Sequence, residues 1–264
     1  AFGHVRLSII DISNGTQPMF SPDGRYVMIY NGEVYNFLEL RQLLHQKGHK
    51  LKTYSDTEVI LHMYMEFGKD MLNQLNGMFS FAIYDHEERT TFIARDHFGV
   101  KPFYYYQKDN LFAFGSEIKA LLKHPKIQAK RNDKNLHEYL TFQMILGNES
   151  LFDNIHKLEP AHYMVVKDGK IIENKEYWKP EYNIEENKTE EEFADELLLL
   201  LQNSLSIQIR SDVPLGAYLS GGIDSSLVSV LASKFYFGQL KTFTGGFKLS
   251  QDYDETRYAK IVSD

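Results

Sequence analysis

MFSFAIYDHEERTTFIARD, residues 78–96, is the stretch that decides the fold of the first part of the chain. Two short runs of aromatic and β-branched residues flank a charged segment, a pattern typical of neighbouring antiparallel strands. PFYYYQ (102–107) and LFAFG (111–115) continue it, so we predict an antiparallel meander from residue 78 onward. AHYMVVKDGKIIENKEYW (161–178) adds a hairpin that turns at Asp168-Gly169.

Helical segments lie on both sides of this meander. YVMIY (26–30) is β-rich and is followed by turn chemistry in NGE. FLELRQLLHQKG (37–48) and YSDTEVILHMYMEFG (54–68) have helical spacing, the second with Ser55 or Asp56 as its N-cap. SEIKALLKH (116–124) returns to helix. Sheets covered by helices fit this order better than a βαβ array does.

The composition shifts near residue 180. KPEYNIEENKTEEE (179–192) is polar and mostly acidic, which favours a linker that leads into a solvated helix. After it we expect a strand in PLGAYLS (214–220), a Gly-rich loop and a helix in SSLVSVLASKF (225–235). A strand in LKTFTGGF (240–247), an acidic turn and a helix in DETRYAKIVSD (254–264) complete the start of a parallel α/β unit. We therefore place two domains, at 1–180 and 181–264.

Composition excludes several classes of function. The formal charge of -7 argues against a protein that binds nucleic acid through phosphates. The longest leucine run, 197–201, is far shorter than the roughly 20 apolar residues of a membrane span. There is no cysteine, so disulfides, a thiolate metal site and a Cys nucleophile are excluded within these residues, and the ten histidines show no zinc-binding pattern.

SGGIDSS (220–226) is a candidate phosphate loop between a strand and a helix. Glycines let the backbone approach an anion, and the free N–H groups of a helix N-terminus together with small hydroxyls can bind it. The structural alternative is a tight turn with a capping side chain. No G-K-[ST] follows, so the loop is not a Walker A motif. It resembles the PP-loop of ATP pyrophosphatases, which implies adenylation chemistry with Mg²⁺ neutralising the pyrophosphate.

Polar residues in the first part could form a site for an amino acid. Arg6 lies in HVRLSIID, which alternates like a strand; Asn31, Gly32 and Glu33 follow a strand; and Asp56 begins a helix. A guanidinium and two carboxylates suit a zwitterion, and an Asn side chain beside a Gly N–H suits an oxyanion. An edge ion pair, an Asn-Gly hairpin turn and an N-cap explain the same residues structurally.

A family resemblance joins these segments. HVRLSIID, QPM, NGEVYN, SDTEVIL, LNGMFSFAIYD, RDHFGVKPFYY and SEIKALL, followed by DVPLGAYLSGGIDSS, resemble glutamine-hydrolysing asparagine synthetase of the bacterial B type. The resemblance implies an α+β, four-layered αββα N-terminal nucleophile (Ntn) hydrolase-like glutaminase domain followed by an incomplete α/β PP-loop domain. It also implies ammonia transfer from glutamine to aspartate activated by ATP as β-aspartyl-AMP, with release of AMP and pyrophosphate. From this resemblance we expect a cytoplasmic ligase that has no membrane or nucleic-acid partner. A homodimer is the assembly to test.

The same resemblance assigns roles to individual residues. The oxyanion hole would be Asn31 and Gly32. The metal ligand would be Asp224. The remaining glutamine-binding residues would be Arg6, Leu7, Ser8, Ile9, Ile10, Glu33 and Asp56. The ATP-binding residues would be Leu219, Ser220, Gly221, Gly222, Ile223, Asp224, Ser225, Ser226 and Gly245. We interpret Arg95, Asp96 and Glu117 as structural or interdomain polar contacts.

The chain departs from the family pattern in two places. The N-terminal nucleophilic Cys, whose own α-amino group would act as base, is absent, and so is the family's second ATP motif, of the form S-G-E-G-x-D-E. We expect a piece of a longer protein rather than a natural remnant, without glutaminase or synthetase turnover of its own.

Other functions remain open at this point. Related enzymes amidate sugar uronic acids or close a β-lactam ring and keep S-G-G-x-D-S. A glutamine-binding module without hydrolysis would fit the missing Cys but leaves the loop without a role. PP-loop enzymes that modify tRNA lack the first domain, and the acidic charge argues against them.

Overall fold

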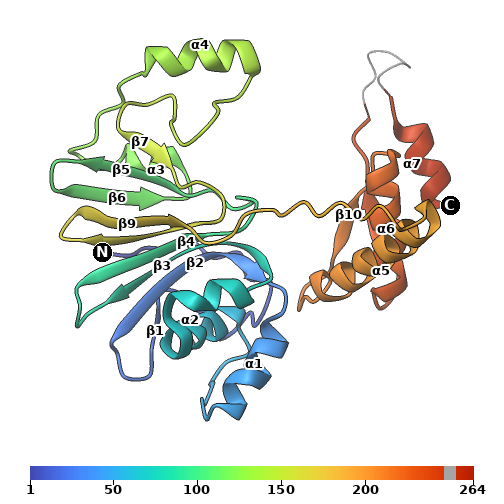
Figure 1. Cartoon of the computed structure of the whole chain (residues 1–264), viewed down its shortest axis with the longest axis horizontal. Coiled ribbons are helices and arrows are strands. Elements are labelled where there is room, and N and C mark those ends of the chain that lie inside the picture. Colours follow the sequence, from blue (N-terminus) through green and yellow to red (C-terminus); the bar gives the residue numbers. More distant parts are fainter. Residues whose placement is uncertain (247–253) are drawn as a thin grey trace. The chain divides into compact units, whose positions relative to one another are not determined.

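The computed structural model describes residues 1–246 and 254–264, in two compact units, Ala1–Glu181 and Tyr182–Asp264 (Figure 1). The strands of the first unit are β1 Met19–Phe20, β2 Tyr26–Val34, β3 Gly77–Asp85, β4 Thr90–Arg95, β5 Tyr104–Lys108, β6 Leu111–Gly115, β7 Ile155–Lys157, β8 His162–Lys167 and β9 Lys170–Glu176. Its helices are α1 Phe37–Gln46, α2 Asp56–Phe67, the 3-10 helix η1 Gly68–Gln74, α3 Ile118–Leu121 and α4 Asp133–Phe142.

The first unit contains two antiparallel sheets. One has six strands in the order β1-β2-β3-β4-β8-β9, and the other has three in the order β6-β5-β7. The strands that the sequence predicts as one meander are therefore divided between two sheets: β3 and β4 lie in the first, and β5 and β6 in the second. The expected hairpin at Asp168-Gly169 is confirmed: both residues have positive φ, 49° and 75°, and they connect β8 to β9.

Strand alternation sorts the core of this unit into layers. In β3, Phe81 and Ile83 pack in the cluster that includes residues of α1 and α2, whereas Ala82 faces the opposite way. Ala82 joins a second cluster with Tyr105 of the three-stranded sheet and with Phe103, which precedes β5. Because successive side chains of a strand point to opposite faces, one sheet is covered on both sides. A third cluster joins the three-stranded sheet to α3, which gives the expected αββα order (Figure 1).

The two central helices begin and end close to where the sequence predicts. Ser55 is the N-cap of α2, and its side chain accepts a hydrogen bond from Thr57 N–H. Gly68 ends α2 at φ 55°, and Gly48 follows α1 at φ 89°. Capping signals act over three or four residues, so they can be recognised without knowledge of the fold.

Three expectations in the first unit are wrong. NGE forms no turn, because β2 continues through it to Val34 and pairs with β3 along its whole length. HVRLSIID is not a strand: residues 1–18 belong to no ladder, although exposure alternates over residues 1–9. The helix expected at residues 116–124 is limited to Ile118–Leu121.

The second unit contains α5 Glu190–Gln208, β10 Gly216–Tyr218, α6 Ile223–Phe235, β11 Lys241–Phe243 and α7 Thr256–Ser263. Thr189 and Glu192 form a capping box at the start of α5, which fits the predicted acidic helix start. β10 and β11 are parallel, as expected of an α/β unit. Phe247 and the expected acidic turn at 252–253 lie outside the described residues.

Candidate active site

The free edge of β2 forms one wall of the candidate site. β1 pairs only with Val27 and Met28, so the edge is open beyond them. Phe79, which lies opposite Gly32, uses its N–H and C=O groups on Asp96 instead. In an antiparallel ladder, both backbone groups of a residue point to the same side. Gly32 N–H is therefore directed away from β3, toward the open edge.

The neighbouring edge amides are held by side chains. Tyr30 N–H donates to Gln17 Oε1 at 2.6 Å, and Val34 N–H donates to Asp56 Oδ2 at 3.1 Å. Gly32 N–H lies between these two groups on the same edge. Asn31 and Gly32 thus occupy the interior of a strand, where the ladder fixes the backbone more firmly than a hairpin turn would.

Glycine is required at position 32 because β2 and β3 approach each other closely there. A Cβ atom built on Gly32 would lie 2.2 Å from Met78 O and 2.7 Å from Phe79 Cα. Both are backbone atoms and cannot move aside without separating the strands. The glycine that the sequence offers as half of a turn is thus a packing requirement of the sheet.

Two buried carboxylates lie beside this edge. Glu33 is 8% exposed and Asp56 is 6% exposed. Burial raises the pKa of Glu33 to about 7, with a further contribution from the negative charge of Asp56; Lys101 acts in the opposite direction. Burial also raises the pKa of Asp56, while the Tyr30 hydroxyl, which donates to Oδ2 at 2.8 Å, favours its charged form. A bound cation would offset this clustering of negative charge.

Arg6 belongs to the same candidate site, but its guanidinium also binds carbonyl groups of the nearby backbone. Its Nη2 donates to the carbonyls of Ile10 and Asp11 at 2.6 and 2.9 Å, and its Nη1 donates to Ile12 O at 3.1 Å. Gly15 leaves room for this arrangement, because a Cβ there would lie 2.2 Å from Nη2. Arg6 therefore organises the turn after residue 9 in addition to lining the cavity.

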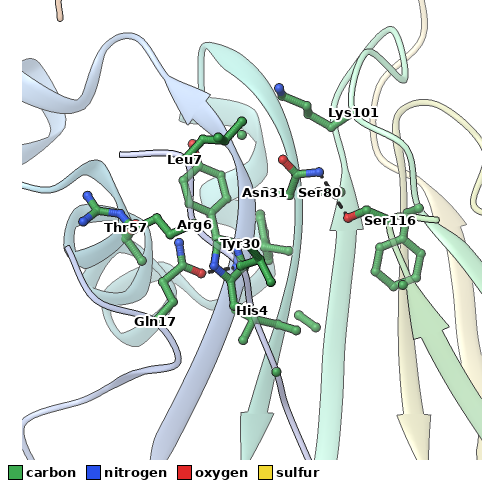
Figure 2. A pocket seen from close by; sticks show the side chains of 18 of the residues that line it. His4, Arg6, Leu7, Gln17, Tyr30, Asn31, Thr57, Ser80, Lys101 and Ser116 are labelled. Carbon is green, nitrogen blue, oxygen red and sulfur yellow. Dashed lines mark hydrogen bonds between the residues drawn. The ribbon is translucent and has the colours of Figure 1, made fainter. Parts of the chain in front are cut away.

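These groups border one cavity of about 550 Å³ (Figure 2). The residues that the sequence assigns to glutamine and that line it are Arg6, Leu7, Ile9, Ile10, Asn31, Gly32, Glu33 and Asp56. Ser8 is not among the lining residues. Leu7 is 89% exposed. The structure thus brings together eight of the nine assigned residues, from three separate stretches of sequence.

The polar lining residues that were given no binding role from the sequence include Gln17, Tyr30, Lys101 and Ser116. Asn31 Nδ2 donates to Ser116 Oγ at 3.1 Å, across 85 positions of sequence. Lys101 and Ser116 lie within family-like motifs, but nothing local indicates that they reach β2. The packing of the two sheets brings Ser116 to Asn31, and the loop after β4 brings Lys101 within electrostatic range of Glu33.

Arg95 and Asp96 have the structural role that the sequence suggested. Arg95 donates to the carbonyls of Gly99, Lys101 and Leu158. Asp96 accepts from four backbone N–H groups, those of Phe79, Phe98, Val100 and Lys101. Together they fix the loop that carries Lys101 to the cavity. Glu117 is exposed and pairs with Lys119 at 2.6 Å.

The loop of the second unit follows β10 and opens α6. Leu219 is buried, and its N–H and C=O groups bond to Phe243 O and Thr244 Oγ1. Ser220 Oγ and Ser225 Oγ lie 2.9 Å apart, and Ser225 Oγ also accepts from Ser220 N–H. These short-range contacts close the loop upon itself.

Much of the loop that is expected to bind an anion faces solvent. Gly222 is the N-cap of α6, and Gly222, Ile223 and Asp224 are exposed. Gly221 has φ 85°, and a Cβ there would lie 2.5 Å from Tyr258 Cβ, so α7 packs closely against it. Ser226 lies in the first turn of α6, and the exposed Gly245 follows β11. All nine assigned residues lie in the loops that follow two adjacent strands, β10 and β11, or at the start of α6.

Metal binding at this loop would rely on one carboxylate. Within the described ranges, no group of three His, Cys, Asp or Glu side chains could hold a metal ion. Asp224 lies in the first turn of α6, and its exposed position suits a cation that is shared with phosphate oxygens. Mg²⁺ is commonly held by one or two carboxylates together with substrate phosphates, so the residues present fit that ion.

Comparison with known proteins places these sites in a family. Residues 1–178 match the family model described as a glutamine amidotransferase domain. The chain belongs to the glutamine amidotransferase family. Residues 196–264 match a second model, described as asparagine synthase. The loop of the second unit lies within that match.

Several curated proteins are similar to this chain over both of its units. The chain is 39% identical over 262 residues to asparagine synthetase [glutamine-hydrolyzing] 3 of Bacillus subtilis (strain 168), covering 96% of the chain and 41% of the relative. It is 37% identical to asparagine synthetase 1 of the same strain, with 98% and 40% covered, and 35% identical to asparagine synthetase 2, with 98% and 36% covered. The chain thus spans about two fifths of the length of these relatives. None of the described helices has the length and apolar character needed to span a membrane.

Proposed function

We propose that this chain supplies the glutamine pocket and part of the ATP site of a glutamine-dependent asparagine synthetase, a carbon–nitrogen ligase with glutamine as amido-N donor. The first unit takes glutamine and the second takes ATP. Ammonia released from glutamine attacks β-aspartyl-AMP, formed from aspartate and ATP, which yields asparagine and AMP; pyrophosphate leaves when the adenylate forms. The relatives bear this activity in their names.

The observation that carries the proposal is the polarity of the cavity in the first unit. Glu33 and Asp56 supply negative charge for an α-ammonium group, and Arg6 has the charge for an α-carboxylate. Ile9, Ile10 and the exposed Leu7 add backbone and apolar surface. Binding of the ammonium favours the ionised form of Glu33, which burial disfavours in the empty pocket. An L-α-amino acid matches this distribution of charge.

Two donors at the same cavity suit a tetrahedral intermediate. Gly32 N–H points to the open edge of β2, and the Asn31 side chain extends from the adjacent position. Preorganised N–H donors stabilise the oxyanion that forms when an amide carbon is attacked. Asn31 and Gly32 therefore act as the oxyanion hole. The attacking thiolate comes from outside these residues, because they contain no cysteine.

In the second unit, SGGIDSS holds the phosphates of ATP. The amides at the start of α6 and the hydroxyls of Ser220, Ser225 and Ser226 would bind the anion, and Asp224 would hold Mg²⁺. When bound, the ion neutralises charge on the departing pyrophosphate. Leu219 and Gly245 border the adenosine. We propose residues 1–180 and 181–264 as the corresponding functional domains of a cytoplasmic protein that assembles as a homodimer.

The test uses the protein expressed from its complete gene. Purified protein is assayed for ammonia release from glutamine, and for pyrophosphate and asparagine formation with ATP, Mg²⁺ and aspartate. Asn31→Ala is expected to lower glutamine-dependent turnover on the order of 100-fold, as loss of one oxyanion donor does. Turnover with ammonia supplied directly should survive this change. Absence of aspartate-dependent pyrophosphate release, or release with another carboxylic acid only, would refute the proposed acceptor.

Asp224→Asn provides the complementary variant. It should abolish both the glutamine-dependent and the ammonia-dependent synthesis while ammonia release from glutamine persists, since Asp224 belongs to the ATP site. A loss of ammonia release equal to that of Asn31→Ala would contradict the assignment of the two sites to separate units.

A further inference from the structure

Ser116 comes directly after β6 and meets Asn31 of β2, so it joins the two sheets at the cavity. Its Oγ accepts from Asn31 Nδ2 at 3.1 Å (Figure 2). Asn31 belongs to the same strand face as Ile29, which packs in the cluster between the sheets. The contact therefore lies between the sheets rather than at an exposed rim, and both residues line the cavity.

The Asn31 backbone and its side chain are fixed by different means. Its position in β2 is set by pairing with Ser80 of β3. The terminal torsion of an asparagine side chain is intrinsically broad, so the ladder does not determine where the amide points. The hydrogen bond to Ser116 removes that freedom. It uses one of the two N–H groups on Nδ2 and leaves the second as a donor.

The character of the acceptor is suited to an oxyanion site. A hydroxyl accepts a hydrogen bond without placing a negative charge beside the group that must receive one. The adjacent carboxylate, Glu117, is 61% exposed at its side chain and pairs with Lys119 at 2.6 Å. Its charge is therefore screened by solvent and by a cation.

We propose that Ser116 is a positioning residue for glutamine hydrolysis, which orients the Asn31 side-chain amide as an oxyanion donor from the opposite sheet. This inference rests on the proposed glutaminase function of the pocket. Ser116 acts through Asn31 and does not itself contact the substrate. Its effect should consequently appear when the oxyanion forms, rather than when glutamine binds.

The test compares Ser116→Ala with Ser116→Thr in the protein expressed from its complete gene. Loss of one hydrogen bond predicts a fall in kcat for ammonia release of about tenfold in Ser116→Ala, with KM changed less than about twofold. Ser116→Thr keeps the hydroxyl and should recover most of the loss. Ser206→Ala, which removes an exposed hydroxyl on α5 that bonds to Asn203 O, is the matched control and should behave as wild type.

A double-mutant cycle decides between positioning and general destabilisation. In an Asn31→Ala background, Ser116→Ala should have no further effect on kcat, because the group that it orients is gone. Additive losses, or a KM increase equal to the kcat loss, would overturn the inference while leaving the glutaminase function intact. Wild-type protein without ammonia release would overturn the proposed function itself, and the positioning role with it.

Discussion

The two candidate sites are built in opposite ways. The pocket of the first unit gathers Arg6, Asn31, Asp56, Lys101 and Ser116 from separate elements and buries its carboxylates. The loop of the second unit is a continuous stretch, largely exposed, whose hydrogen bonds are short-range. A contiguous loop can be recognised from its letters. A pocket assembled by two sheets depends on a fold that no single segment specifies.

Glycine illustrates the same contrast. Gly32 is enclosed by the backbone of β3, whereas a Cβ on Gly222 would meet only Ser220 Oγ, at 3.3 Å. Gly32 is required by a strand from elsewhere in the chain, whereas the Cβ position of Gly222 meets only a flexible side chain of its own loop. Substitutions at positions constrained by distant parts of the chain, set beside substitutions at positions constrained only by their neighbours, can therefore test this contrast between the two sites.

The largest expected effect concerns the cysteine nucleophile, which these residues lack. The 264 residues contain no cysteine, so we expect them, purified alone, to release no ammonia from glutamine above the buffer rate. An enzyme-coupled ammonia assay with millimolar glutamine measures this, and circular dichroism shows whether the chain is folded. Saturable, glutamine-dependent release comparable to that of a complete enzyme would show that the pocket carries its own nucleophile.

Replacement of the enclosed glycine should be the most damaging change in stability. Gly32→Ala forces a methyl group against Met78 O, and we expect it to lower the free energy of unfolding by about 3 kcal/mol or more. Gly222→Ala is the control and should cost about 1 kcal/mol or less, because one serine rotamer can yield. Urea unfolding compares the two. Equal losses would contradict the distinction between enclosed and open glycines.

The next effect is pH-dependent and belongs to Glu33. Its pKa rises from 4.5 to about 7 in the folded chain, so the folded state binds this proton more tightly than the unfolded state does. The resulting stabilisation is complete below pH 4.5 and is lost as pH rises through 7. Relative to wild type, Glu33→Gln should therefore raise the free energy of unfolding by about 2 kcal/mol at pH 8 and little at pH 5.

Urea unfolding of both proteins at the two pH values measures this difference. Asp224→Asn, which removes the charge of an exposed carboxylate in the second unit, is measured beside it as the control. A gain for Glu33→Gln that is the same at pH 5 and pH 8 would mean that ionisation of the buried carboxyl is not its cause.

The smallest effect is expected in the loop. Ser225→Ala removes contacts to Ser220 and Gly222 that are exposed to water. We expect the free energy of unfolding to change by about 0.5 kcal/mol, while Mg²⁺-ATP binding to the protein from the complete gene weakens severalfold. Calorimetric titration with ATP measures the second quantity. A loss of stability comparable to that of Gly32→Ala would show that the loop is part of a core after all.

Features that depend on a few neighbouring residues could be predicted from the sequence. Ser55 caps its helix, Gly68 ends it, and Asp168-Gly169 turns its hairpin. The strand–loop–helix order around SGGIDSS also needs no tertiary information. In each case, the backbone geometry is set by the side chain or the conformational freedom of the residue itself.

Features that depend on partners elsewhere could not be predicted in the same way. Asn31-Gly32 has a strong local preference for a turn, but pairing of nine residues of β2 with β3 outweighs it. Val5 and Leu7 alternate like strand residues, yet no strand among the described residues pairs with them. Ser116 follows an ordinary strand, and only the packing of two sheets gives it a partner in Asn31.

The side chains that occupy the edge of β2 also affect how the sheet meets other polypeptides. An unpaired strand edge is a template on which another chain can add, and exposed edges promote aggregation. Gln17 and Asp56 accept from the amides on either side of Gly32, so an incoming strand would find only one free donor between two occupied ones. The groups that prepare the pocket for a small molecule thereby also protect the sheet against extension by a second polypeptide.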